Sequence, residues 1–166
     1  MRSVIAVYVE NKYGVLTRVS GLFMRRGFNI DSLTVGETDD PKYSRITITI
    51  NGDTYVRDQL IYQLQKLHNV KQVKNLSSDS SVERELLLLK VKNTSENRSE
   101  IMAAAEIYRA KIIDYTTDAM CVEVTGEPSK IKAFIEVMKP LGIVEMCRTG
   151  VVSLERGAAI MEKESQ

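Results

Sequence analysis

The first loop of the chain carries the residue types best suited to binding a small charged ligand. The run Glu10-Asn11-Lys12-Tyr13-Gly14 follows an apolar segment and precedes a helical pattern that starts at Val15 and Leu16. Backbone N–H groups at a helix start attract anions because they have no partner inside the helix, and Gly14 lets a ligand approach the backbone closely. The Asn11 amide can accept a hydrogen bond from an ammonium group. The loop could therefore hold a free amino acid, although asparagine and glycine are also common in plain strand-to-helix turns.

The rest of the chain offers little for catalysis. It contains neither a G-x-x-x-x-G-K-[ST] loop nor a G-x-G-x-x-G fingerprint. The single histidine, His68, suits the negative C-terminal end of a helix. Asn11 and Arg18 are residue types that a small acyl phosphate hydrolase uses, but no glycine-rich cradle lies between them. Since no nucleophile and base can be paired, we predict no catalytic site and no metal site in this chain.

The spacing of apolar residues predicts the elements that position the first loop. Runs rich in β-branched residues indicate strands, and apolar residues three or four apart indicate helices that bury one face. Gly27 suits the end of the first helix, and Asp53 suits the start of the second. Strands are predicted at 3–10, 29–37, 43–51 and 70–76, with helices after Gly14 and after Asp53, which gives the order β-α-β-β-α-β.

The same order repeats after the polar stretch 77–81, which has no periodicity and is typical of a linker. Strands are predicted at 82–92, 111–117, 119–125 and 143–154, with a capping-box-like pair at Asn97 and Glu100 before one helix and Pro128 at the start of another. We therefore predict an α+β protein of two tandem ferredoxin-like βαββαβ units. The expected boundaries are 1–77 for the first domain, 78–82 for the linker and 83–166 for the second, with a frayed charged tail from Glu155.

Composition narrows the classes of partner. A net charge of +1 argues against nucleic acid, which usually requires a basic face. No apolar run approaches the about 18 residues that a membrane span needs. Cys121 and Cys147 fall on strands that are not neighbours in the expected sheet, so free thiols and a reducing cytoplasm are expected. Because two small units each have a thin core, oligomerisation is also expected.

One family shares the long motif that surrounds the first loop. The shared residues are the loop itself, Arg18-Val19-Ser20-Gly21-Leu22-Phe23, Arg26-Gly27-Phe28-Asn29-Ile30-Asp31-Ser32-Leu33-Thr34-Val35, and the runs 38–41, 44–47, 82–86, 112–114 and 148–151. In these residues the chain resembles the small regulatory subunit of acetohydroxyacid synthase (acetolactate synthase), whose first unit is an ACT domain. The resemblance covers both predicted units in order, and such a long run is far more specific than a short motif.

The resemblance implies a feedback-inhibitor site for valine, or for leucine or isoleucine, where two ACT domains of a homodimer meet. One chain would supply the first loop and the partner would supply the start of the second strand. These positions correspond here to Asn11, Gly14, Val15 and Leu16 from one chain and to Asn29 and Ile30 from the other. An edge strand with small residues on one face, such as Ser32, Thr34 and Gly36, can pair with its symmetry mate.

The resemblance also implies that catalysis belongs to a separate large subunit, which carries thiamine diphosphate, a metal ion and FAD. That subunit condenses pyruvate with pyruvate or 2-oxobutyrate in branched-chain amino-acid biosynthesis. This chain would bind none of those cofactors, but would activate the large subunit and confer inhibition by valine. Two alternatives stay open. The chain could sense another small ligand through its ACT domain, or it could be an assembly module that binds no effector.

Overall fold

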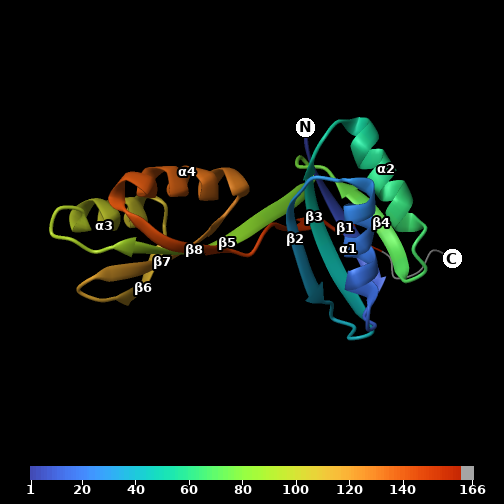
Figure 1. Ribbon diagram of the computed structural model, residues 1–166, viewed down its shortest axis with the longest axis horizontal. Coiled ribbons are helices and arrows are strands. Elements are labelled where there is room, and N and C mark those ends of the chain that lie inside the picture. The colour runs from blue at the N-terminus through green and yellow to red at the C-terminus, as the bar shows by residue number, and fades with distance from the viewer. Residues whose placement is uncertain (162–166) are drawn as a thin grey trace. The chain divides into compact units, whose positions relative to one another are not determined.

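Antiparallel sheets organise both halves of the computed structural model, which describes residues 1–161 (Figure 1). The first unit has the sheet order β2-β3-β1-β4, and in the second the four strands of the repeated motif lie in the order β6-β7-β5-β8. Each unit follows the order βαββαβ, so the predicted pair of ferredoxin-like units is confirmed. No helix in the described residues is long and apolar enough to span a bilayer.

The elements of the first unit follow the predicted pattern closely. They are β1 (Arg2–Glu10), α1 (Val15–Arg26), β2 (Ile30–Glu37), β3 (Tyr43–Asn51), α2 (Thr54–Gln65) and β4 (Val70–Leu76). Helix α1 ends at Gly27, which has a φ of 67° and donates its N–H to the Phe23 carbonyl. Helix α2 starts at Asp53, whose carboxylate accepts the Val56 N–H at 2.9 Å. Both predicted helix boundaries are confirmed because local capping chemistry sets them.

Strand β1 is apolar on both of its faces, and both are buried. Ile5 and Val7 point into the core under α1 and α2. Val4, Ala6 and Tyr8 point to the opposite, outer face of the sheet, where they form a second small cluster. A strand buried on both faces requires cover on both sides of its sheet.

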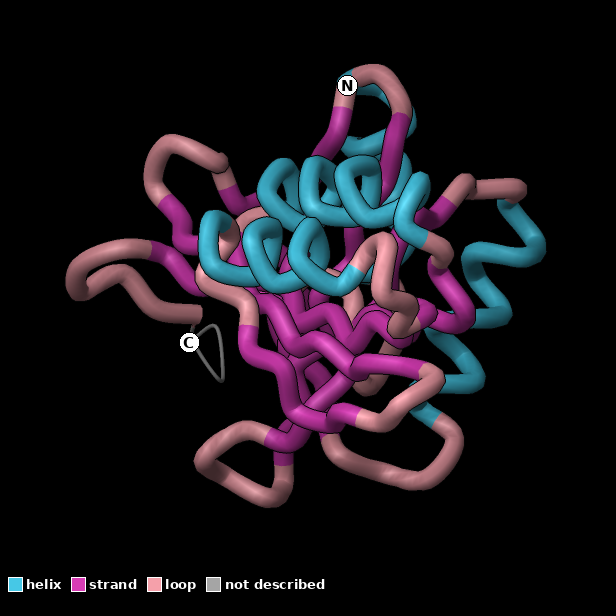
Figure 2. Tube along the Cα trace, turned by 90° about the vertical axis from the view of Figure 1, so that its left-hand side faces the viewer, coloured by secondary structure: helices cyan, strands magenta, loops and turns pink. Residues whose placement is uncertain are grey.

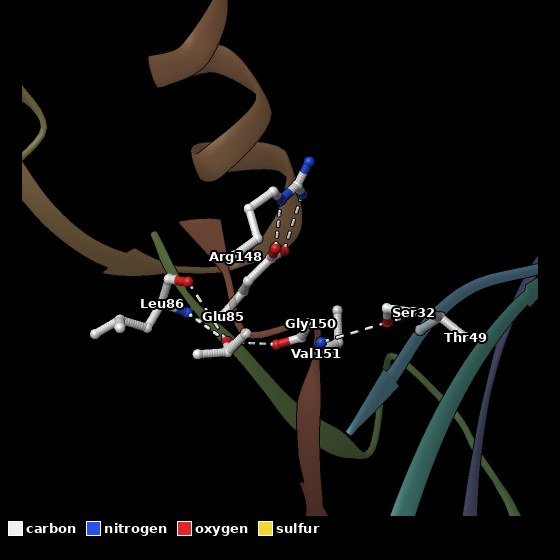
Figure 3. A network of polar contacts seen from close by, with 8 residues as sticks. Ser32, Thr49, Glu85, Leu86, Arg148, Gly150 and Val151 are labelled. Carbon is white, nitrogen blue, oxygen red and sulfur yellow. Dashed lines mark hydrogen bonds and ion pairs between the residues drawn. The ribbon is translucent and has the colours of Figure 1, made fainter. Parts of the chain in front are cut away.

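The C-terminal segment supplies that outer cover. Strand β9 (Val152–Glu155) belongs to the first unit, where the Val151 N–H donates to Ser32 Oγ at 3.4 Å (Figure 3). Arg45 Nη2 donates to the Ser153 carbonyl at 2.8 Å, so the segment is hydrogen-bonded to β3 as well as to β2. Met161 is 8% exposed and completes the outer cluster.

This packing corrects the predicted boundaries. The predicted strand 143–154 is interrupted, and β8 (Ile143–Arg148) stays in the second unit while the chain from Val151 onward belongs to the first. The first unit also extends to Val82, because Ser81 and Val82 start β5 (Ser81–Lys92) instead of ending a linker. The predicted tail is held at two positions, since Glu155 pairs with Lys74 at 2.8 Å and Met161 is buried, whereas residues 156–160 between them are exposed. The rest of the predicted tail, 162–166, lies outside the described residues.

In the second unit, α3 (Arg98–Ile107) and α4 (Pro128–Met138) lie together on one face of the sheet (Figure 2). The other elements are β6 (Lys111–Tyr115), β7 (Ala119–Gly126) and a short 3-10 turn, η1 (Lys139–Leu141). The core centres on Phe134, which is fully buried and packs edge-on against Tyr108. Cys121 on β7 and Cys147 on β8 flank the central strand β5, and both thiols are free, as predicted.

Two polar contacts in the second unit differ from what the sequence predicted. The capping box predicted from Asn97 and Glu100 does not form, because Asn97 Oδ1 accepts the Thr94 N–H at 2.9 Å and no side chain caps α3. The unpredicted contact joins Arg148 to Glu85, with Nε–Oε1 at 2.5 Å and Nη2–Oε2 at 3.1 Å (Figure 3). The Glu85 side chain is 3% exposed, so this ion pair neutralises a buried carboxylate.

Candidate functional site

The first loop is fastened to the loop between β2 and β3 through Asn11. The Asn11 backbone N–H donates to the Lys42 carbonyl at 2.7 Å. Its side-chain Nδ2 donates to the Pro41 carbonyl at 3.0 Å and to Glu37 Oε2 at 3.3 Å. The two N–H bonds of the side-chain amide are therefore used within the chain, and Oδ1 is left as the acceptor for another group.

Helix α1 starts in the open beside this amide. Gly14 has a φ of 85° and provides no side-chain cap. The Val15 N–H donates to the Lys12 carbonyl at 3.3 Å, so the N–H groups of Leu16 and Thr17 are those at the helix start that can meet an anion. A Cβ placed on Gly14 would meet nothing within 4 Å, which leaves room for a ligand against the backbone. Val15 is 5% exposed and packs into the core, whereas Leu16 is 45% exposed and faces outward.

A cluster of charges fixes the base of the loop. Glu10 pairs with Lys12 at 2.7 Å and with Lys71 at 2.9 Å. The hydrogen bond from Lys12, followed by that from Lys71, lowers the pKa of Glu10 to about 2. Arg18 donates to Asn69 Oδ1 at 2.5 Å. Arg18 and Asn11 therefore contact different partners within the chain.

Asn29 and Ile30 lie at the other end of α1. The helix has 12 residues, so it separates them from Gly14 by about 18 Å within one chain. Ile30 starts β2, which is one of the two edge strands of its sheet, and pairs with Ile50. The six predicted site residues thus form two separate groups in a single chain.

A pocket of about 380 Å³ borders Asn29 and was not predicted from the sequence. Tyr55, Gln59 and Gln63 of α2 line it, together with Arg26 from the last turn of α1. Arg26 Nη2 donates to Gln63 Oε1 at 3.2 Å. The three α2 residues are spaced four apart, which places them on one helix face, and this spacing is the signal that could have identified them.

A second pocket, of about 410 Å³, lies on the outer face of the first sheet. Tyr8, Glu37 and Arg45 form one side of it, and Leu154 and Ile160 of the C-terminal segment form the other. Burial lowers the pKa of the Arg45 guanidinium. The sequence could not predict this pocket, because its two sides come from opposite ends of the chain.

Metal ligands are not gathered anywhere in residues 1–161. No group of three or more His, Cys, Asp or Glu side chains in this part of the chain could hold a metal ion. His68 is exposed and lies just beyond α2.

Comparison with known proteins shows the family that this chain resembles in both units. The family model for the AHAS small subunit-like ACT domain matches residues 5–72, and that for the small subunit of acetolactate synthase matches residues 84–157. A probable acetolactate synthase small subunit from Archaeoglobus fulgidus is 50% identical over 157 residues, covering 95% of this chain and 98% of that protein. The small subunit of Escherichia coli acetolactate synthase isozyme 3 is 44% identical over 162 residues, covering 97% of this chain and 99% of that protein.

A solved structure agrees with the sequence relatives. The crystal structure of the acetolactate synthase small subunit from Thermotoga maritima has a TM-score of 0.88 and 38% identity, and the match covers 96% of this chain and 99% of that one. The matches include residues of both units, and not of the ACT domain alone. This chain belongs to the family of acetolactate synthase small subunits, with an ACT domain as its first unit.

Proposed function

We propose that this chain is a regulatory subunit that activates a separate large catalytic subunit of acetolactate synthase and confers feedback inhibition by valine. Leucine and isoleucine are the other candidate effectors. Membership of the small-subunit family supports the partnership with a large subunit. The observation that carries the effector proposal is the uncapped start of α1 at Gly14, open on one side and next to the Asn11 amide oxygen.

Each end of an amino acid matches one part of this site. The α-carboxylate binds the N–H groups at the start of α1, where the helix dipole favours an anion. The α-ammonium donates to Asn11 Oδ1, since the Nδ2 group of that amide already donates to Pro41 and Glu37. The exposed Leu16 side chain offers apolar surface for an aliphatic ligand.

In this proposal the site is completed in a homodimer. Strand β2 is an edge strand, and pairing with its symmetry mate would extend the sheet and bring Asn29 and Ile30 of the second copy to the first loop. Valine then favours one arrangement of the two ACT domains, because a ligand shifts an equilibrium only through its different affinities for the two states. Coupling of about 1–3 kcal/mol is typical of such regulation.

Catalysis is assigned to the large subunit. Thiamine diphosphate, a metal ion and FAD would bind there, and that subunit would condense pyruvate with pyruvate or 2-oxobutyrate. This chain would carry no cofactor. A reducing cytoplasm is the proposed location, and the free thiols of Cys121 and Cys147 agree with it.

Titration calorimetry of the purified chain tests the effector site directly. L-Valine should bind with stereoselective heat, and L-leucine, L-isoleucine and D-valine serve as comparison ligands. Asn11→Ala should weaken binding by about 1 kcal/mol, or about fivefold, through loss of one hydrogen bond. Gly14→Asp should weaken it further, because it places a negative charge where the carboxylate binds. Asn75→Ala makes the same residue change at an exposed position of β4 and should have no effect.

Mixed dimers test the shared geometry. A dimer with Asn11→Ala on one chain and Asn29→Ala on the other should keep one unaltered site and lose the second. If Asn11→Ala and Gly14→Asp both bind valine as tightly as the wild type, the proposed pocket is wrong. If no amino acid binds either the chain or its complex with the large subunit, yet the chain raises large-subunit activity, the chain is an assembly module.

A further inference from the structure

Glu37, the last residue of β2, places a carboxylate beside the proposed ammonium site. Its Oε2 accepts the Asn11 Nδ2 at 3.3 Å, and the side chain is otherwise exposed. Nothing in the sequence indicated this contact, because Glu37 and Asn11 are 26 residues apart. The contact exists because Asn11 is fastened to the loop between β2 and β3, where its amide also donates to Pro41.

A count of donors and acceptors shows what the two side chains offer a ligand. Asn11 uses its amide N–H groups within the chain, so it presents an acceptor, Oδ1. An ionised carboxylate only accepts hydrogen bonds, and Glu37 receives one of them at Oε2, which leaves the other oxygen available. The pair therefore presents two neighbouring acceptors, one of which carries a full negative charge.

The other carboxylate next to Asn11 is engaged elsewhere. Glu10 pairs with Lys12 and Lys71 and accepts a hydrogen bond from Asn69 Nδ2 at 3.2 Å. Its charge is thus balanced within the chain before any ligand arrives. Glu37 receives an amide N–H from Asn11, which orients it without neutralising it.

We infer that Glu37 is a specificity-determining residue of the effector site, whose negative charge selects ligands that carry an ammonium group next to their carboxylate. The inference rests on the proposed function, because it assigns a role within that effector site. Amino acids are then preferred over the corresponding 2-oxo and 2-hydroxy acids, which have the same carbon skeleton but place no cation against Glu37. Such a preference would matter for a subunit whose proposed partner enzyme works on 2-oxo acids.

The substitution Glu37→Gln tests the negative charge of this side chain while keeping its size. The glutamine keeps the length of the side chain and an oxygen that can accept the Asn11 N–H, but it removes the negative charge. Calorimetry should compare L-valine with (S)-2-hydroxy-3-methylbutanoate, in which a hydroxyl replaces the ammonium. Valine affinity should fall about tenfold or more, as expected for a hydrogen bond between charged groups, while affinity for the hydroxy acid should stay constant or rise. Glu127→Gln removes an exposed carboxylate from the second unit and should change neither value.

The outcomes distinguish this inference from the function on which it rests. If the wild-type chain and its complex with the large subunit bind no valine, the effector site itself is wrong, and the role of Glu37 falls with it. If the wild type binds valine and Glu37→Gln binds it equally well, the effector site stands and the inference is overturned. Equal losses for valine and the hydroxy acid would also overturn it, because they would show that Glu37 only positions Asn11.

Discussion

Arg148→Met should show how much the ion pair of Arg148 with the buried Glu85 carboxylate stabilises the second unit. Arg148 is the charged partner of Glu85, which is 3% exposed, whereas the Arg148 side chain is 44% exposed. The hydrogen bond to Glu85 raises the pKa of Arg148, so the guanidinium stays charged throughout the accessible pH range. Methionine keeps most of the apolar stem but leaves the Glu85 carboxylate without its cation (Figure 3).

The size of the effect follows from the burial of the two partners. Removing one member of a fully buried ion pair costs about 3–5 kcal/mol, because a charge is left without compensation. Water reaches the exposed side of this pair, so we expect Arg148→Met to destabilise the second unit by about 2 kcal/mol. Combining it with Glu85→Gln removes the buried charge and should restore at least half of that loss.

Native-state hydrogen exchange measures this effect within one unit of the full chain. The free energy of opening should fall for amides of β5 and β8 in Arg148→Met and recover in the double variant. Arg84→Met is the control, since Arg84 and Glu127 are 3.9 Å apart and both are more than half exposed. The reasoning is refuted if Arg148→Met costs less than about 0.5 kcal/mol, as an exposed pair would, or if the double variant is as unstable as the single one.

Two further predictions concern the first unit. Met161→Ala should destabilise this unit by about 2 kcal/mol, which is the lower end of the cost of truncating a buried methionine to alanine. Hydrogen exchange of the β1 amides measures this loss. Met24→Ala, at an 84% exposed position, should have no effect, and an equal effect of the two substitutions would contradict the packing of Met161. Because the pKa of Glu10 is lowered from 4.5 to about 2, its stabilising contribution should be complete above pH 4.5 and disappear as the pH falls toward 2. Glu10→Gln should lack this part of the pH dependence. If the free energy of unfolding changes with pH in the same way for the variant and the wild type between pH 2 and 5, the result contradicts the ion pairs of Glu10 with Lys12 and Lys71.

Local signals predicted most of the fold. Alternation over 43–51 and the capping residues Asp53 and Gly27 set elements whose physical causes lie within a few residues, and the structure has them where the pattern indicates. The Asn97–Glu100 pair shows the limit of such signals. Its spacing suits a capping box, but Asn97 instead donates to the Lys92 and Leu141 carbonyls, and Leu141 is remote in sequence.

Long-range packing could not be predicted in the same way. Thr47 and Thr49 alternate with isoleucines, which is typical of a solvent-facing side of a strand, yet they are only 3% and 2% exposed. Strand β1 did hold a signal, since it is apolar on both faces and such a strand needs cover on each side. The identity of the covering segment depends on contacts between the two ends of the chain, which no local pattern records.

The parts of the candidate site that lie close together in the sequence could be predicted, whereas its contacts between distant segments could not. Asn11 and Gly14 stand out because a helix start, a glycine and an amide fall within a few residues. The contact between Glu37 and Asn11 and the pocket beside Asn29 appear only once β2 and α2 are placed. The proposed pairing of Asn11 with Asn29 of a second copy comes from the resemblance to a known family, because the fold of a single chain cannot suggest it.

The return of the chain to the first unit has a consequence for folding during synthesis. The second unit comprises the continuous stretch 83–150, so all of it emerges from the ribosome before the segment that completes the first unit. The cluster on the outer face of β1 is therefore incomplete until Met161 has been made, and this cluster brings Met161 together with Val4 from the opposite end of the chain. Since such distant contacts form slowly, the unit that is synthesised first should be the last to reach its native stability.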